Sequence, residues 1–183
     1  YARRFRSEGY PLEAMVLDGP WRGGPEFLEK YMRDGEYPTN DVDWHPDFGD
    51  GPAMVRQLAD IGVRTVLHQN SRNFKQETIT AGLADGVLRR QGLEVVVRVT
   101  DPTAEAWYIE RLRPRHREGV AMWWLDHGDR MSGEIAPGIP SRNLFGALWA
   151  RLGDEAGRAE GRPPGLSLCR GAGIGGQRYA LPW

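Results

Sequence analysis

Four short apolar runs, each continuous rather than alternating, constrain this chain most strongly. They read as β-strands whose two faces are both covered. Between them lie stretches with the apolar spacing of a helix, as at residues 53–61, where Gly62 follows and ends the helix. Strand and helix alternate, which predicts an α/β fold with a parallel sheet and helical crossovers. The predicted strands are 12–17, 64–68, 120–125 and 166–169, with a fifth at 94–99, and further helices are predicted at 104–112 and 144–152.

Polar side chains follow these predicted strands at the points where the strands should end. Asp18, Asp126 and Arg170 come directly after the first, third and fourth strands, and His68 and Asn70 end the second. In parallel α/β folds the ligand site lies at the carboxyl edge of the strands. The sequence therefore predicts that these side chains gather at one edge of the sheet.

Asp126 is the most informative of these residues. Aspartate is a poor strand residue and is costly to bury unless something pairs with it. Trp123 and Trp124 precede it, and a tryptophan face suits the apolar C–H face of a pyranose. A strand-end acid beside tryptophan fits a carboxylate presented to a sugar ring. The alternatives are that Asp126 caps a helix or lies in a loop, and that Trp123 packs between sheet and helices. We expect His127 to lie behind the site or on the surface.

Length and composition exclude several classes of protein. A chain of 183 residues suffices for one domain with a core. The net charge of −1 gives no sign of a nucleic-acid partner or an anionic membrane surface. Cys169 is the only cysteine, which excludes an internal disulfide and a cysteine-based zinc site. No apolar run approaches the roughly 20 residues of a membrane span, and the N-terminus lacks a secretory stretch, which favours a cytoplasmic location.

Two other patterns invite a metal or a cofactor. An acidic loop holds five candidate ligands, but Pro46 stands at the position where a calcium-binding EF-hand needs glycine, so a solvated loop is predicted. Residues 171–176 formally match a dinucleotide-binding glycine pattern, but no helix follows them. We therefore expect no metal and no cofactor. The acidic-loop candidates are Asp41, Asp43, His45, Asp47 and Asp50.

Five motifs occur along the chain in a set order. They are Val16-Leu17-Asp18, then Asp43-Trp44-His45-Pro46-Asp47-Phe48, then Trp124-Leu125-Asp126, then Leu168-Cys169-Arg170, and finally Gly175-Gly176-Gln177-Arg178-Tyr179 running to Trp183. The ordered set resembles the catalytic barrel of glycoside hydrolase family 31, the α-glucosidase and α-xylosidase group. The resemblance spans nearly the whole chain.

The resemblance implies a fold and an activity. The fold would be a partial (β/α)8 TIM barrel with about four to five parallel strands, and residues 1–183 would be a fragment of one catalytic barrel domain, truncated at both ends. The activity would be that of a retaining α-glycoside hydrolase acting on an oligosaccharide or a small α-glycoside. No nucleic-acid or membrane partner is expected, and homo-oligomer formation is left open.

The resemblance also implies roles for individual residues. Asp126 would be the catalytic nucleophile. Asp18 and Arg170 would hydrogen-bond the sugar at the cleavage point, Trp124 and Trp183 would wall that pocket, and His68 would contribute near the same edge. The substrate-binding residues would thus be Asp18, His68, Trp124, Arg170 and Trp183.

Three departures from the family pattern keep alternatives open. Gly128-Asp129 stands where members usually carry Asn-Glu, and residues 69–74 lack an expected proline. The family's general acid is the Asp of a Trp-x-Gly-Asp motif whose tryptophan would be Trp183, so the resemblance places the proton donor beyond this residue. The alternatives are a catalytically inactive carbohydrate-binding barrel and an α-galactosidase-like barrel hydrolase.

Overall fold

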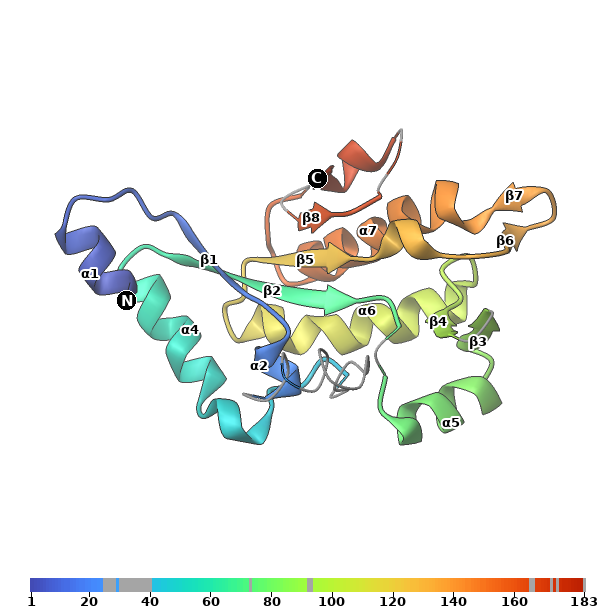
Figure 1. The fold of residues 1–183 in the computed structure, drawn as a ribbon, viewed down its shortest axis with the longest axis horizontal. Helices are drawn as coiled ribbons and strands as arrows, with labels where there is room; N and C mark the ends of the chain where they lie inside the picture. The colour runs from blue at the N-terminus through green and yellow to red at the C-terminus, as the bar shows by residue number, and fades with distance from the viewer. Residues whose placement is uncertain are drawn as a thin grey trace.

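The protein is built on one parallel β-sheet, seen in a computed structural model (Figure 1). The structure describes residues 1–24, 29, 41–72, 74–91, 94–164, 167–171, 173 and 175–182. The sheet has five strands in the spatial order β1-β2-β5-β8-β9, and every neighbouring pair is parallel. Its strands are β1 (Ala14–Leu17), β2 (Arg64–Asn70), β5 (Met122–Asp126), β8 (Ser167–Cys169) and β9 (Ala180–Pro182).

Helices and two small antiparallel hairpins connect the strands. Such crossovers are what parallel pairing demands, and they confirm the predicted α/β alternation. The helical segments are α1 (Ala2–Ser7), α2 (Pro20–Gly23), η1 (Pro46–Phe48), α4 (Gly51–Asp60), α5 (Gln76–Ala84), α6 (Pro102–Arg117), η2 (Gly128–Arg130), α7 (Ser141–Ala159) and η3 (Gly176–Arg178). The hairpins pair β3 (Leu88–Gln91) with β4 (Glu94–Val97), and β6 (Glu134–Ala136) with β7 (Ile139–Pro140).

Side-chain caps fix where two of the long helices begin. The Asp50 carboxylate accepts from the backbone N–H of Ala53 at 2.8 Å at the start of α4. Asp101 caps α6 in the same way, accepting from the N–H of Thr103 at 2.9 Å. These bonds satisfy backbone donors that a first helical turn leaves unpaired. Gly62, at φ 73°, follows α4 as its sequence position predicts.

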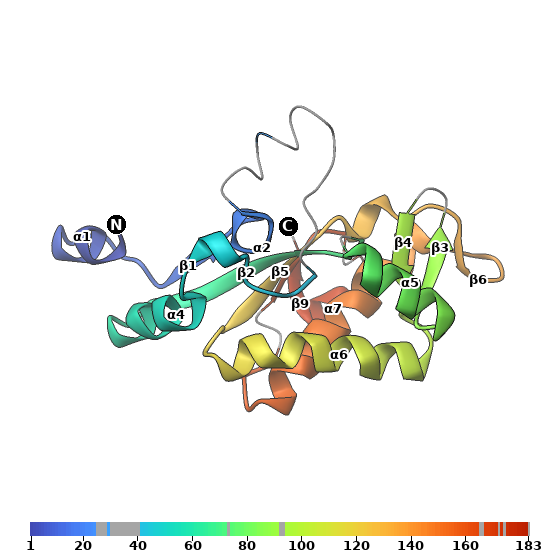
Figure 2. The same cartoon turned by 90° about the horizontal axis from the view of Figure 1, so that it is seen from below.

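The core lies between the sheet and helices α6 and α7, which Figure 2 shows together on one side of the strands. Trp123, Leu125 and Cys169 are fully buried on this side. Trp123 donates from its indole Nε1 to Nε2 of His116 in α6 at 2.8 Å, and His116 Nδ1 lies 3.0 Å from the carbonyl oxygen of Val120. The packing alternative for Trp123 is therefore the one observed.

The structure differs from the elements predicted from the sequence in three places. The run at 94–99 forms β4, but it pairs with β3 in a separate hairpin, and the fifth strand of the main sheet is β9 instead. Helix α7 extends to Ala159, well beyond the predicted end at residue 152. Helix α5 was not predicted, because its apolar residues do not gather on one face. Among the described helices, none combines the length and apolarity needed to cross a bilayer.

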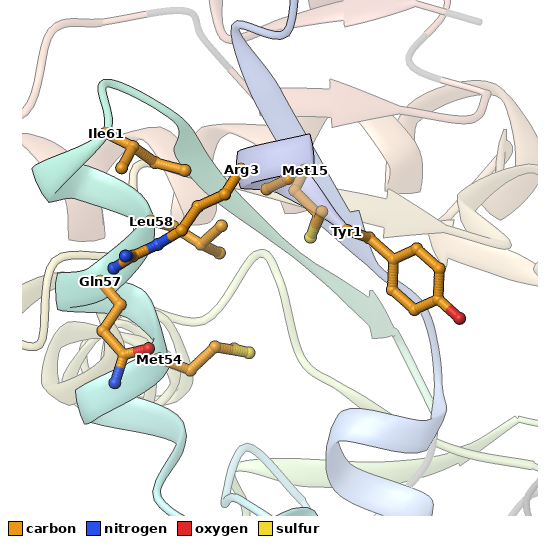
Figure 3. Close-up of a pocket in the computed structure, with 8 residues that line it drawn as sticks. Tyr1, Arg3, Met15, Met54, Gln57, Leu58 and Ile61 are labelled. Carbon is orange, nitrogen blue, oxygen red and sulfur yellow. The ribbon is translucent and has the colours of Figure 1, made fainter. Parts of the chain in front are cut away.

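The opposite face of the sheet carries exposed apolar side chains. Val16 in β1 is 45% exposed and Leu181 in β9 is 56% exposed. Through the pairings of β9 with β8 and β8 with β5, Leu181 shares a face with Trp124. A separate apolar cavity of about 280 Å³ lies between α1, β1 and α4 (Figure 3), lined by Tyr1, Ala2, Arg3, Met15, Met54, Gln57, Leu58 and Ile61. None of these lining residues is a predicted site residue.

Candidate active site

The strand register brings the predicted site residues to one edge of the sheet. Asp18 directly follows β1, and Arg170 directly follows β8. Asp126 is the last residue of β5 and pairs in register with Asn70 at the end of β2. His68 lies opposite Trp124 in the same pairing. The carboxyl edge is thus a single location, as the alternation of strands and helices predicted. Trp183 lies outside the described residues.

The Asp126 carboxylate is surrounded by hydrogen-bond donors. Its Oδ1 lies 3.1 Å from Nε of Arg170 and accepts from the backbone N–H of His127 at 2.9 Å. Its Oδ2 lies 3.1 Å from Nε2 of His127 and 3.4 Å from Nε2 of His68. Asp126 is only 7% exposed. Each carboxylate oxygen therefore faces two nitrogen atoms, and these contacts fix the plane of the carboxylate.

These donors decide the charge of Asp126. Burial alone would raise the pKa of Asp126, because it disfavours the charged form. Hydrogen bonds from His127 and His68, together with the nearby charge of Arg170, outweigh burial and hold the pKa of Asp126 well below its usual range. The carboxylate is therefore ionised throughout the physiological pH range.

His68 lies between the two acids of the edge. Its Nδ1 is 3.6 Å from Oδ1 of Asp18, while its Nε2 faces Asp126. Burial lowers the pKa of His68 despite the hydrogen bond with Asp126. The His68 carbonyl accepts from the indole Nε1 of Trp21 at 2.7 Å, which fixes this part of β2. Its ring meets Trp124 edge-on, with the centroids 4.6 Å apart.

Asp18 is the solvent-exposed acid at this edge of the sheet. Its side chain is 57% exposed, whereas that of Asp126 is 10% exposed. The carboxylate accepts from the backbone N–H of Gly19 at 2.6 Å. An exposed carboxylate at the same edge as Asp126 is accessible to a hydroxyl group of an incoming ligand.

Arg170 joins Asp126 to Asp129. Its Nε lies 2.9 Å from Oδ1 of Asp129 as well as near Asp126. Gly171 permits this approach, because its φ is 74° and a Cβ there would lie 2.5 Å from Cβ of Asp129. A cavity of about 480 Å³ adjoins the site on this side, lined by Asp129, Met131, Ser132, Gly133, Pro140 and Arg142.

Two residues at this edge were not found by sequence reasoning. His127 was expected behind the site or on the surface, and the structure places it behind the site: it is 5% exposed and contacts Asp126 directly, although no role was predicted for it. Arg72 lies just beyond β2, and its Nη2 is 3.0 Å from Nδ1 of His127. The signal for Arg72 was its position after a strand, the same rule that identified Arg170. For His127 the sequence held no signal beyond adjacency to Asp126.

The acidic loop is solvated, as predicted, at Asp43 and Asp47, whose side chains are 59% and 70% exposed, but Asp41 departs from the prediction. Asp41 is only 2% exposed. Its Oδ2 pairs with Nη2 of Arg111 at 2.8 Å, and its Oδ1 accepts from the N–H of Lys75 at 2.7 Å. The loop therefore docks onto α6 through the ion pair of the buried Asp41 with the partly exposed Arg111. Within the part of the chain that the structure describes, no group of three or more His, Cys, Asp or Glu side chains could hold a metal ion.

Cys169 lies behind the site. It is fully buried, and its thiol donates to the carbonyl of Gly146 at 3.5 Å. Burial raises the pKa of this thiol to about 12, with the negative charges of Asp126 and Asp129 acting in the same direction. Cys169 is therefore a packing residue of β8 and is not a nucleophile.

Comparisons with known proteins agree with this geometry. Residues 1–183 match the family model for the TIM-barrel domain of glycosyl hydrolases family 31. The fold is similar to that of a family 31 dextranase from Flavobacterium johnsoniae complexed with glucose (TM-score 0.78, 20% identity). It is also similar to a family 31 α-xylosidase from a soil metagenome complexed with xylose (TM-score 0.71, 20% identity) and to a cycloalternan-degrading enzyme from Trueperella pyogenes (TM-score 0.71, 21% identity). No curated protein matches the chain in sequence.

The chain spans only part of these solved relatives. The comparisons cover 100%, 100% and 99% of this chain, but 24%, 28% and 31% of the dextranase, the α-xylosidase and the cycloalternan-degrading enzyme. At this level of identity the likeness shows the fold, and the family model identifies the five-stranded sheet as part of a TIM barrel.

Proposed function

The chain belongs to glycoside hydrolase family 31, and on that premise we propose that the protein is a retaining α-glycoside hydrolase with Asp126 as its nucleophile. The observation that carries the proposal is the state of Asp126. A buried carboxylate at the carboxyl edge of a TIM-barrel sheet is held ionised by Arg170, His68 and His127. A nucleophile must be charged and fixed in this way before the substrate arrives.

The reaction proceeds in two displacements. The Asp126 carboxylate attacks the anomeric carbon, the bond from that carbon to the leaving oxygen breaks, and a proton donor protonates that oxygen. Water then attacks the resulting glycosyl ester, transfers a proton to the conjugate base of the donor, and releases Asp126 as a carboxylate. Two inversions retain the anomeric configuration.

The remaining predicted residues bind the sugar in this proposal. Asp18 accepts hydrogen bonds from sugar hydroxyls, because its side chain is exposed beside the nucleophile. Arg170 donates to the sugar while it neutralises Asp126. Trp124 presents an apolar ring face. The same pocket-wall role is proposed for Trp183, and the Trp124 ring contacts that of His68.

The proton donor and the domain boundaries extend the proposal. The family resemblance places the general acid after Trp183, so residues 1–183 supply the nucleophile half of the catalytic pair. We therefore assign them to one catalytic barrel domain whose remaining strands complete the fold. The substrate is an oligosaccharide or a small α-glycoside.

The experiment uses the full-length protein and a panel of activated aryl α-glycosides. The relatives include a dextranase and an α-xylosidase, so the panel includes aryl α-glucoside and α-xyloside, with aryl α-galactoside to test the galactosidase alternative. We expect hydrolysis of a glucoside or a xyloside, with the α-anomer as the first product seen by proton NMR. A β-anomer as the first product would contradict a retaining mechanism.

A second variant tests Asp126 itself. Asp126→Gly removes the nucleophile, and added azide should then attack the anomeric carbon and give the β-glycosyl azide. Recovery of that product would identify position 126 as the site of attack. Near-normal hydrolysis by Asp126→Gly without azide would end the proposal. Full-length protein that binds sugars but hydrolyses no glycoside of the panel would support the inactive carbohydrate-binding alternative.

A further inference from the structure

His127 has an unusual backbone conformation. Its φ is 67° and its ψ is 17°, and Asp41 is the other non-glycine residue with positive φ in the described part of the chain. This left-handed conformation is unfavourable for an L-residue, so it persists only where the surroundings determine it. Here it brings the imidazole back against Asp126, the residue before it, with Nε2 3.1 Å from Oδ2.

The partner on the other ring nitrogen assigns the proton on His127. Nδ1 of His127 lies 3.0 Å from Nη2 of Arg72. A guanidinium group has only donors, so Nδ1 must accept. The ring proton is then on Nε2, and it faces a carboxylate oxygen that can only accept. Arg72 is itself anchored by an ion pair with Glu94 of β4.

We propose that His127 is a positioning residue that donates from Nε2 to Oδ2 of Asp126, with Arg72 fixing the tautomer that makes this donation. The inference rests on the proposed role of Asp126 as nucleophile. The hydrogen bond is buried and charge-assisted, so it restricts rotation of the carboxylate. A reacting group displaced by about 1 Å can cost about 10²-fold in rate, so a fixed carboxylate plane contributes mainly to the chemical step.

His68 does not provide the same restraint. Its two ring nitrogens face two carboxylates, Asp126 at 3.4 Å and Asp18 at 3.6 Å. A neutral imidazole carries one ring proton and can donate to only one of them. Its Nδ1 has no hydrogen-bond partner among the described residues, and its Nε2 contact with Asp126 is at the long limit of a hydrogen bond. His68 therefore restrains the carboxylate less than His127 does, whose Nε2 lies 3.1 Å from Oδ2.

Kinetics of four variants of the full-length enzyme test the proposal. His127→Leu removes the donor and should lower kcat by about 10²-fold with KM changed less than about threefold. His127→Gln can donate to Asp126 and accept from Arg72, and should stay within about tenfold of the wild-type kcat. Arg72→Met removes the donor that fixes the tautomer of His127 and should lower kcat by about tenfold. Arg113→Met, whose acidic partners are Glu160 and Glu110, is the control and should leave kcat unchanged.

The kinetic results can overturn the proposal in two ways. Either an unchanged kcat for His127→Leu, or a fall for His127→Gln as large as that for His127→Leu, would show that His127 acts only in packing. Thermal unfolding of each variant identifies any loss that comes from misfolding. If the wild-type enzyme hydrolyses no glycoside of the panel, it is the proposed function that fails.

Nitrogen NMR of ¹⁵N-histidine-labelled protein decides the tautomer without any activity. We expect the His127 ring to carry its proton on Nε2, and we expect that resonance to move in Asp126→Asn. Arg72→Met should convert the signal to a mixture of the two tautomers. A proton on Nδ1 of wild-type His127, or a ring signal indifferent to both substitutions, would overturn the inference.

Discussion

Two regions around strand β5 use histidine in opposite ways. On the helix-facing side, His116 accepts from the indole of Trp123 and donates to the Val120 carbonyl, so its partners are neutral and its proton is on Nδ1. At the carboxyl end of the same strand, His127 contacts Arg72 and Asp126, both charged. His116 therefore joins α6 to β5 in the core through hydrogen bonds, whereas His127 orients the Asp126 carboxylate.

The difference teaches that burial alone does not distinguish structural from functional residues. His116 is 1% exposed and His127 is 5% exposed. The two histidines differ in the charge of their partners. The neutral partners of His116 stabilise the fold, whereas the charged contacts from Arg72 through His127 to Asp126 help to keep Asp126 ionised. Substitutions on the two sides of β5 should therefore affect different measurements.

The largest expected effect is at the carboxyl end. Asp126→Asn should lower kcat by about 10⁴-fold or more, because the amide is not a nucleophile. The fold should persist, since asparagine occupies the same volume. Steady-state kinetics and circular dichroism of the purified full-length protein check both halves of the statement. If the variant lost its fold as well as its activity, the carboxyl end of β5 would be needed for stability too, and the two regions would not differ in function.

The next effect is on the helix-facing side. His116→Ala leaves the Trp123 indole N–H without its acceptor and opens a cavity, which should lower the free energy of unfolding by about 2–4 kcal/mol. Activity per folded molecule should not change. Adding Trp123→Phe completes a double-mutant cycle in denaturant, and the second substitution should cost less in the His116→Ala background. Strict additivity would mean that the two rings are not coupled.

A smaller effect tests the exposed end of the site. Asp18→Asn should lower kcat/KM by about 10- to 100-fold, because a neutral amide replaces a charge-assisted acceptor for the sugar hydroxyls. Stability should be unaffected, since the Asp18 side chain is 57% exposed. Comparison of kcat/KM with thermal unfolding separates the two. An unchanged kcat/KM would remove Asp18 from the binding site.

The smallest effect is in the pH dependence of stability. Burial lowers the pKa of His68 and of His116 below the ordinary value of 6.5. As pH falls below 6.5, the unfolded chain binds protons that the folded chain does not, so stability should fall. Denaturant titrations of the wild type and His68→Gln on either side of pH 6.5 check this. The variant should lose less stability than the wild type as the pH falls, and an equal loss would contradict the burial of a neutral His68.

The sequence predicted the main sheet because apolar runs alternate with helical patterns and polar residues follow the runs. The parallel alternation placed Asp18, His68, Asp126 and Arg170 at one edge, and the coordinates put them there. The pairing partner of the β-branched run at 94–99 was beyond such reasoning, since periodicity does not identify a neighbour. β9 was also missed, because it is short and contains Pro182, which an edge strand tolerates.

The contacts of Asp126 were only partly predictable. Arg170 was expected at the same edge as Asp126 because both follow predicted strands, and the two side chains lie 3.1 Å apart. The direct contact of His127 with Asp126 was not predicted, because successive residues of a strand point to opposite faces, and the left-handed backbone at His127 brings its ring back against Asp126. Arg72 and Glu94 lie in separate segments of the long connection between β2 and β5, so their link to His127 depends on tertiary packing that spacing in the sequence does not encode.

The buried thiol behind β8 has a practical consequence. With its pKa raised to about 12, Cys169 carries almost no thiolate at neutral pH and should not react with maleimide reagents. Because it is the only cysteine in these 183 residues, this segment gives no background labelling. A cysteine introduced at Ser132, in the wall of the cavity beside Asp129, could therefore carry a fluorophore whose emission reports sugar occupancy in real time.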